Sequence, residues 1–167
     1  MATATYDLIA SQTLGSAAAS ITFSSIAASW TDLRVVLTGT TASQSFPFLR
    51  FNADTANNYS GTYLDGNGSA ASSLRDSNIS GIYIAGANGD FVSTQVSTAQ
   101  IDIFSYAGST FKTALSAYSG DKNGSGYVVR TVGLWRSTAA ITSVVLFDNG
   151  VNWSIGTTAT LYGIRAA

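Results

Sequence analysis

The sequence predicts an all-β fold, a single-domain antiparallel β-sandwich of jelly-roll type. Short segments alternate apolar and polar residues with a period of two, as in half-buried strands. Clusters that contain Asn-Gly or Asp-Gly, which supply the positive φ angles of tight hairpin turns, separate these segments. The composition favours strands over helices, because all nine acidic residues are Asp, Glu is absent, and the chain holds 24 Ser and 20 Thr.

The clearest alternation lies in residues 31–39, where Leu33, Val35 and Leu37 share one face. Residues 46–52 are apolar on both faces, which is typical of a strand covered on both sides. That segment contains Pro47, the one proline, which cannot donate to a ladder, so we expect an edge strand or a bulge there. Further strands are predicted at residues 101–104, 127–135, 144–147 and 159–164. Together the segments indicate about eight to ten strands.

No linker or break in composition divides the chain, so residues 1–167 are predicted to form one domain. Residues 61–80 are rich in Gly and Ser. We expect them to form a protruding loop, or a poorly paired hairpin centred on residues 65–68.

Charge and residue content exclude several function classes. The net charge is −1 and the sequence has no basic run, so we expect neither nucleic acid nor an anionic membrane as partner. Cys and His are absent, which removes thiolate catalysis, cysteine zinc sites and the commonest general base. The first residues lack the basic and apolar regions of a signal peptide, and no apolar stretch approaches the ~18 residues of a membrane span.

The aspartates give little support to catalysis. Most of them neighbour Gly, Asn, Ser or Thr, where turns favour Asp. Asp102 lies inside a strand instead, and we expect it on a solvated face or in a cross-strand pair with Arg or Lys. Glycoside hydrolysis by two converging carboxylates stays open as a weak alternative. We therefore expect that the protein is not an enzyme and that it binds neither a cofactor nor a metal.

Oxygen-bearing side chains gather after the segment at residues 46–52. Asn52, Asp54 and Asn57, with Thr55, could ligate Ca²⁺, which prefers clustered oxygens. The spacing does not fit an EF-hand loop, however, and a cluster of Asx turns that caps the loop is the favoured interpretation. With Asn58, these residues form one part of a candidate interaction surface.

Aromatic residues supply the other part of that surface. Trp153 follows a turn-rich segment and is the better candidate for an exposed contact, whereas Trp135 lies in a strand and is expected to pack in the core. Tyr59 and Tyr63 flank the expected loop and could serve recognition or subunit packing. The candidate interaction surface therefore comprises Asn52, Asp54, Asn57, Asn58, Tyr59, Tyr63 and Trp153.

Several stretches, taken in order, resemble a family of tailed-bacteriophage virion proteins. They are residues 21–26, 30–37, 49–54, 58–60, 64–68, 133–138 and 159–164, so the resemblance runs from about residue 19 to the end. The resemblance implies an all-β virion component, either a capsid or tail protein or a module on fibres, without catalytic residues. Within the pattern, Arg50 is expected to order the following loop through a charge-assisted bond to Asp54.

Two roles are compatible with this resemblance. The first is a capsid decoration (cement) protein on the outer surface of the head, made in the host cytoplasm, which binds the major capsid protein and itself as a homotrimer. It is favoured because the domain begins almost at Met1, without the shaft of a fibre tip. The second is a small tail or fibre receptor-binding protein that recognises a host surface glycan through the residues around Tyr59 and Tyr63 and through Trp153.

Overall fold

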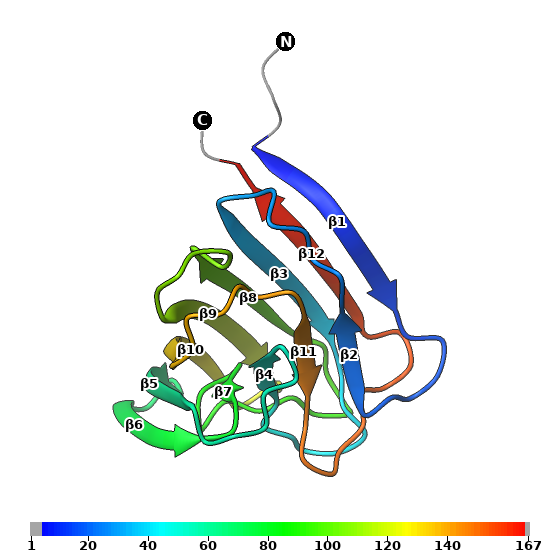
Figure 1. Cartoon of the computed structure of the whole chain (residues 1–167). Helices are drawn as coiled ribbons and strands as arrows, with labels where there is room; N and C mark the ends of the chain where they lie inside the picture. Colours follow the sequence, from blue (N-terminus) through cyan, green and yellow to red (C-terminus); the bar gives the residue numbers. More distant parts are fainter. Residues whose placement is uncertain (1–4, 166–167) are drawn as a thin grey trace.

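The computed structural model describes residues 5–165 and contains two antiparallel sheets that face each other (Figure 1). In spatial order, the eight-stranded sheet consists of β1 (Tyr6–Thr13), β12 (Thr158–Ile164), β3 (Asp32–Gly39), β8 (Ser97–Phe104), β9 (Lys112–Asp121), β10 (Gly126–Trp135), β5 (Tyr59–Gly66) and β6 (Ala71–Ile79). The four-stranded sheet consists of β2 (Ser20–Phe23), β11 (Val144–Phe147), β4 (Phe48–Phe51) and β7 (Ile82–Tyr83). The prediction of an all-β antiparallel sandwich is confirmed.

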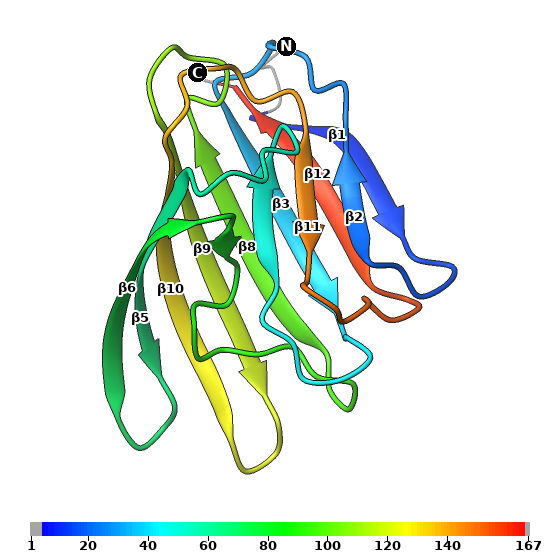
Figure 2. The same cartoon turned by 60° about the horizontal axis from the view of Figure 1, so that its bottom comes forward.

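The core lies between the two sheets, where the period-two alternation of the strands turns one side of each inward. Leu33, Val35 and Leu37 of β3 are fully buried there, as predicted. The smaller sheet lies over the larger one (Figure 2) and contributes buried residues such as Leu49 and Leu146. The segments predicted at 101–104, 127–135, 144–147 and 159–164 coincide with β8, β10, β11 and β12.

Residues 46–52 differ from the prediction. The strand β4 begins after Pro47, whose carbonyl accepts a hydrogen bond from the Ile84 amide, and it pairs with both β11 and β7. It is therefore not an edge strand, and the proline needs no bulge because it precedes the ladder. Only one face of β4 is in the core, since Phe46 is exposed and Phe48 stacks on Tyr83 and Phe147 on the other side.

Residues 61–80, expected as a loop or a poorly paired hairpin, form most of the regular hairpin β5–β6. Its turn is closed by the Asn67 side chain, whose oxygen accepts hydrogen bonds from the amides of Ser69 and Ala70. The inward side of β5 carries the buried Tyr59 and Tyr63, which pack against Phe51 and Tyr83 of the small sheet. Strand β6 forms the outer edge and is exposed over most of its length.

The strands nearest the two ends of the chain are neighbours, because β12 pairs with β1 on one side and with β3 on the other. Residues 5–165 contain no helix long and apolar enough to cross a membrane. One face of the large sheet, which we call the outer face, points away from the small sheet. It holds the candidate site.

Candidate functional site

The outer face divides into two halves of different chemistry. Over β1, β12 and β3 it is largely polar, and hydroxyl groups bond across strands, as in the pairs Ser11–Thr160 and Thr13–Thr158. Leu8 and Val36 are nevertheless exposed there by 65% and 37%. Arg34 of β3 holds Asp102 of β8 with two hydrogen bonds, which raise the pKa of the arginine. The prediction of a cross-strand pair for Asp102 is confirmed. Arg34 and Asp102 thus neutralise each other across β3 and β8.

The other half, over β9, β10 and β5, is apolar and uncovered. Leu64, Leu115, Val128 and Val132, which we call the apolar patch, are exposed by 58%, 43%, 66% and 43%. Val132 lies directly opposite Leu115 in the ladder. Scattered exposed apolar residues are normal on a protein surface, but a contiguous group on adjacent strands indicates a contact surface.

Arg130 lies inside the apolar patch, between Ala117 of β9 and Leu64 of β5. Its side chain is exposed and takes part in no hydrogen bond or ion pair with residues 5–165. A shallow hollow of about 250 Å³ surrounds it, formed on this face by Thr62, Leu64, Leu115 and Val132. Arginine within an apolar surface is the typical composition of a protein interface.

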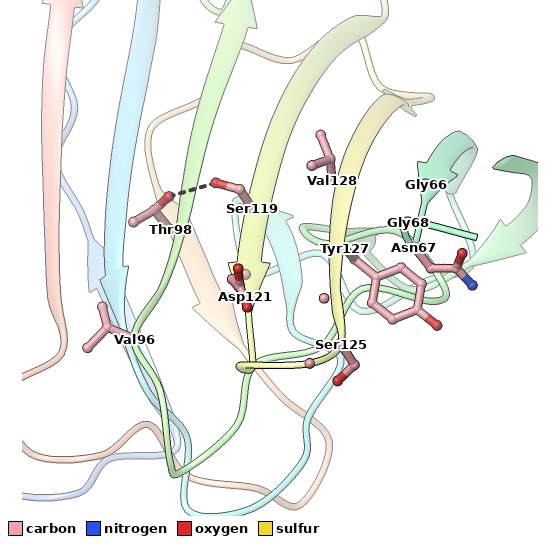
Figure 3. Close-up of a pocket in the computed structure, with 13 residues that line it drawn as sticks. Gly66, Asn67, Gly68, Val96, Thr98, Ser119, Asp121, Ser125, Tyr127 and Val128 are labelled. Carbon is pink, nitrogen blue, oxygen red and sulfur yellow. Dashed lines mark hydrogen bonds between the residues drawn. The ribbon is translucent and has the colours of Figure 1, made fainter. Parts of the chain in front are cut away.

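A larger hollow of about 670 Å³, which we call the trough, lies towards the tips of the hairpins β5–β6 and β9–β10. Figure 3 shows Thr98, Ser119 and Val128 on three neighbouring strands, with Asp121 nearer the tip. The surface is hollow there because several of the lining residues are glycines, which have no side chain. The long side chains around Arg130 flank the trough. The lining glycines are Gly66, Gly68, Gly120, Gly124 and Gly126.

The aromatic residues of the expected interaction surface are not at the surface. Tyr59, Tyr63 and Trp153 are exposed by 0%, 1% and 0%, so the expectation of exposed contacts at these positions is wrong. The Trp153 indole packs edge-on against Phe91 and donates to the carbonyl of Leu146. Burial of such rings in the core outweighs the polar context of the preceding turn.

The loop at residues 52–58 contains an Asx turn at Asp54, so the favoured interpretation of a cluster of Asx turns is confirmed in part. Asp54 accepts hydrogen bonds from the Ala56 amide, the Asn58 side chain and the Trp135 indole. The bond from Trp135, foremost, lowers the pKa of this carboxyl. Asn52 turns inward at a positive φ of 51°, where its oxygen accepts from the amides of Thr142 and Ser143. Asn57 is exposed.

The expected bond from Arg50 to Asp54 is not formed. Arg50 donates instead to the Ser80 carbonyl, and its guanidinium lies over the Phe147 ring at 4.0 Å. Trp135 takes the place of the arginine as the partner of Asp54. The candidate surface is therefore split: its aromatic part is in the core, and the oxygens of Asn52 and Asp54 hold a loop together.

The buried charges of the chain also have structural partners. Lys112 is fully buried and donates to the carbonyls of Gly108 and Thr110, while burial lowers the pKa of its amine. Asp90, 1% exposed, pairs with Lys122. No group of three or more His, Cys, Asp or Glu that could hold a metal lies within residues 5–165.

Sequence reasoning missed the apolar patch and the trough, although a signal was present. Val128 and Val132 alternate with Val129 and Thr131, so β10 is apolar on both faces. In a sheet covered on one side only, the second apolar face must meet water or a partner. The trough had no signal, because its residues come together only through the pairing of β8, β9, β10 and β5.

The chain matches no protein-family model, no curated protein and no solved structure.

Proposed function

We propose that this chain is a non-catalytic structural protein of a tailed-bacteriophage virion, and that it decorates the capsid by binding the major capsid protein. The observation that carries the proposal is the apolar, uncovered half of the outer face, whose residues are exposed by 43% to 66%. A face of this kind packs flat against another subunit of an assembly, whether a different protein or a second copy of the chain.

The resemblance to virion proteins supports the same role. Its segments contribute to parts of the structure that define the sandwich: β2, β3, β4 with its capped loop, the hairpin β5–β6, the end of β10, and β12. The carboxylates support a non-catalytic role, since Asp54, Asp90 and Asp102 are each held by structural partners. Paired carboxylates that act on a glycoside must instead be free to reach the substrate.

Location on the particle is the direct test of this proposal. Antibody labelling of intact virions is expected to decorate the head, and heads that lack the protein are expected to lose genome at lower temperature or in chelator. If labelled antibody bound only tails, and heads without the protein kept their resistance while adsorption to host cells failed, the decoration role would be wrong.

A second candidate, a small tail protein that binds a host glycan, is favoured by the chemistry of the trough. Thr98, Ser119, Asp121 and Asn67 offer short polar groups beside Val128, which suits sugar hydroxyls and C–H faces. On an array of bacterial surface glycans, this role predicts a signal that Asp121→Asn reduces. An absent signal would remove the candidate. Polysaccharide cleavage is expected in neither role.

A further inference from the structure

We propose that the outer face over β8, β9, β10 and β5 is a two-fold interface with a second copy of this chain. The inference goes beyond the virion role and does not depend on it, because it concerns only how two copies of the purified chain meet. It follows from the shape and the charges of three neighbouring rows of residues.

The middle row runs across four strands through Thr98, Ser119, Val128 and Gly66, which are partners in successive ladders. One step away from the hairpin tips, the next outward-facing row is Gln100, Ala117, Arg130 and Leu64. We call this row the ridge. One step towards the tips lie Val96, Asp121, Gly126 and Gly68, which line the trough. The middle row also lines the trough and forms the side of it that adjoins the ridge, where Arg130 and Leu64 are exposed.

Consider a two-fold axis that runs between the two copies, parallel to the middle row and directly above it. Rotation about this axis places the ridge of each copy over the trough of the other. Each ridge then faces the trough of the other copy, and the interface is isologous, with the same contacts made twice. Leu64 would fill the hollow beside the partner's Gly68, while Val128, the most exposed residue of the apolar patch, would meet the partner's Val128. Two sheets packed in this way lie about 10 Å apart.

The charges have the same symmetry as the shape. Arg130 on the ridge has no ionic partner within residues 5–165. Asp121 in the trough is exposed, and its carboxylate accepts a hydrogen bond from the Asn123 amide. Because Asp121 neighbours Gly126 in the β9–β10 ladder, Arg130 placed over the partner's Gly126 comes beside the partner's Asp121. A cation and an anion on opposite sides of the axis make the face complementary to itself.

A second copy fits the charges of this face better than a different protein does, and in such a dimer the major capsid protein would contact the remaining surface. A partner of other composition would have to supply an anion for Arg130 and a cation for Asp121 in the same spacing, which a second copy does by symmetry. The arrangement implies a dimer, whereas the sequence-based expectation is a homotrimer. It also covers the trough, so a glycan in the trough and a second copy on the face exclude each other.

The test is the mass of the purified full-length protein in solution. Sedimentation equilibrium over a range of concentrations is expected to give twice the monomer mass of 17.3 kDa. A monomer at every concentration, or a trimer, would overturn the proposal.

Variants then locate the interface. Val128→Lys places two like charges at the axis, and Arg130→Asp faces the partner's Asp121, so each is expected to weaken self-association by at least about a hundredfold. In the double variant Arg130→Asp with Asp121→Arg, the two charges are exchanged, and dimerisation is expected to recover. All these side chains are exposed, so circular dichroism and thermal melting should stay close to the parent protein.

Ile155→Lys is the matched control, because Ile155 is 68% exposed but lies in the loop before β12, outside this face. Its dimerisation is expected to equal that of the parent protein. If Ile155→Lys dissociated the dimer as strongly as Val128→Lys, or if the charge exchange failed to restore a dimer that Arg130→Asp had lost, the second copy would not sit on this face.

Discussion

The hydrogen bond from the Trp135 indole to the Asp54 carboxylate, 2.7 Å long, connects strand β10 to the loop that follows β4. Trp135→Phe keeps a ring in the core and removes this bond to a charged group. We expect the free energy of unfolding at pH 7 to fall by about 1.5–3 kcal/mol. Denaturation in urea measures the change.

The same bond predicts how the loss depends on pH. The folded pKa of Asp54 lies below its ordinary value of 3.8, so the stabilisation is complete above the unfolded pKa and disappears as the pH falls through the folded pKa. The difference between the parent protein and Trp135→Phe should therefore shrink below about pH 4. Trp153→Phe is the control, because its indole donates to the neutral carbonyl of Leu146. Equal shrinkage in both variants would contradict the assignment to Asp54.

Single residues could be placed from the sequence where a strand pattern surrounds them. Asp102 alternates with Ile101 and Ile103, and its pairing with Arg34 follows from that position. Trp153 has no such pattern, because it lies in an irregular segment after β11. Its isolated bridges to Ala18 and Thr41, far apart in the sequence, decide its burial. The apolar patch is intermediate between Asp102 and Trp153. The sequence shows the alternation of its residues along the strand, but it does not show which face of the strand meets water.

At the scale of strands, the two sheets approach closely where β7 crosses β10. Gly133 of β10 makes this possible, since a Cβ atom there would lie 2.4 Å from Cγ2 of the buried Ile82. We expect Gly133→Ala to lower the free energy of unfolding by about 1–3 kcal/mol through overpacking. Chemical denaturation of Gly133→Ala, Ile82→Ala and the double variant measures the effect.

The double variant should lose less stability than the two single variants together, because the shortened side chain leaves room for the new methyl group. Gly15→Ala is the control, because Gly15 lies between β1 and β2 and a Cβ there would meet no atom within 4 Å. Simple additivity in the double variant would show that the cost of Gly133→Ala does not come from Ile82.

The strands that could be predicted are those with one face in the core. Strands β3 and β8 alternate cleanly because the small sheet covers only one side of the large one. Strand β6 gives no such signal, since nearly all of its residues are exposed and the ladder to β5 holds it. Strand β4 was predicted too long because Phe46 and Phe48, outside the core, are as apolar as the buried Leu49.

For the molecule as a whole, composition predicted the fold class but not the order of the strands. In the large sheet, β12 lies between β1 and β3, and β3 pairs with β8. Several of its ladders therefore join strands that are far apart in the sequence. No local turn specifies such pairings. They follow from which strands can bury their apolar faces together, and this also explains why the trough could not be predicted.

This dependence on distant pairings predicts that the sandwich unfolds as one unit. The three tryptophans report on different regions: Trp30 packs over Gly163 near the β1–β12 pair, Trp135 stacks on Tyr59, and Trp153 lies near β11. Because most buried side chains belong to one continuous core, tryptophan fluorescence and far-ultraviolet circular dichroism should follow a single transition in urea. In Trp30→Phe the two curves should again coincide, although that variant loses the bond to Asp7. A fluorescence midpoint below the circular dichroism midpoint in the parent protein, absent in Trp30→Phe, would show instead that the β1–β12 edge melts first.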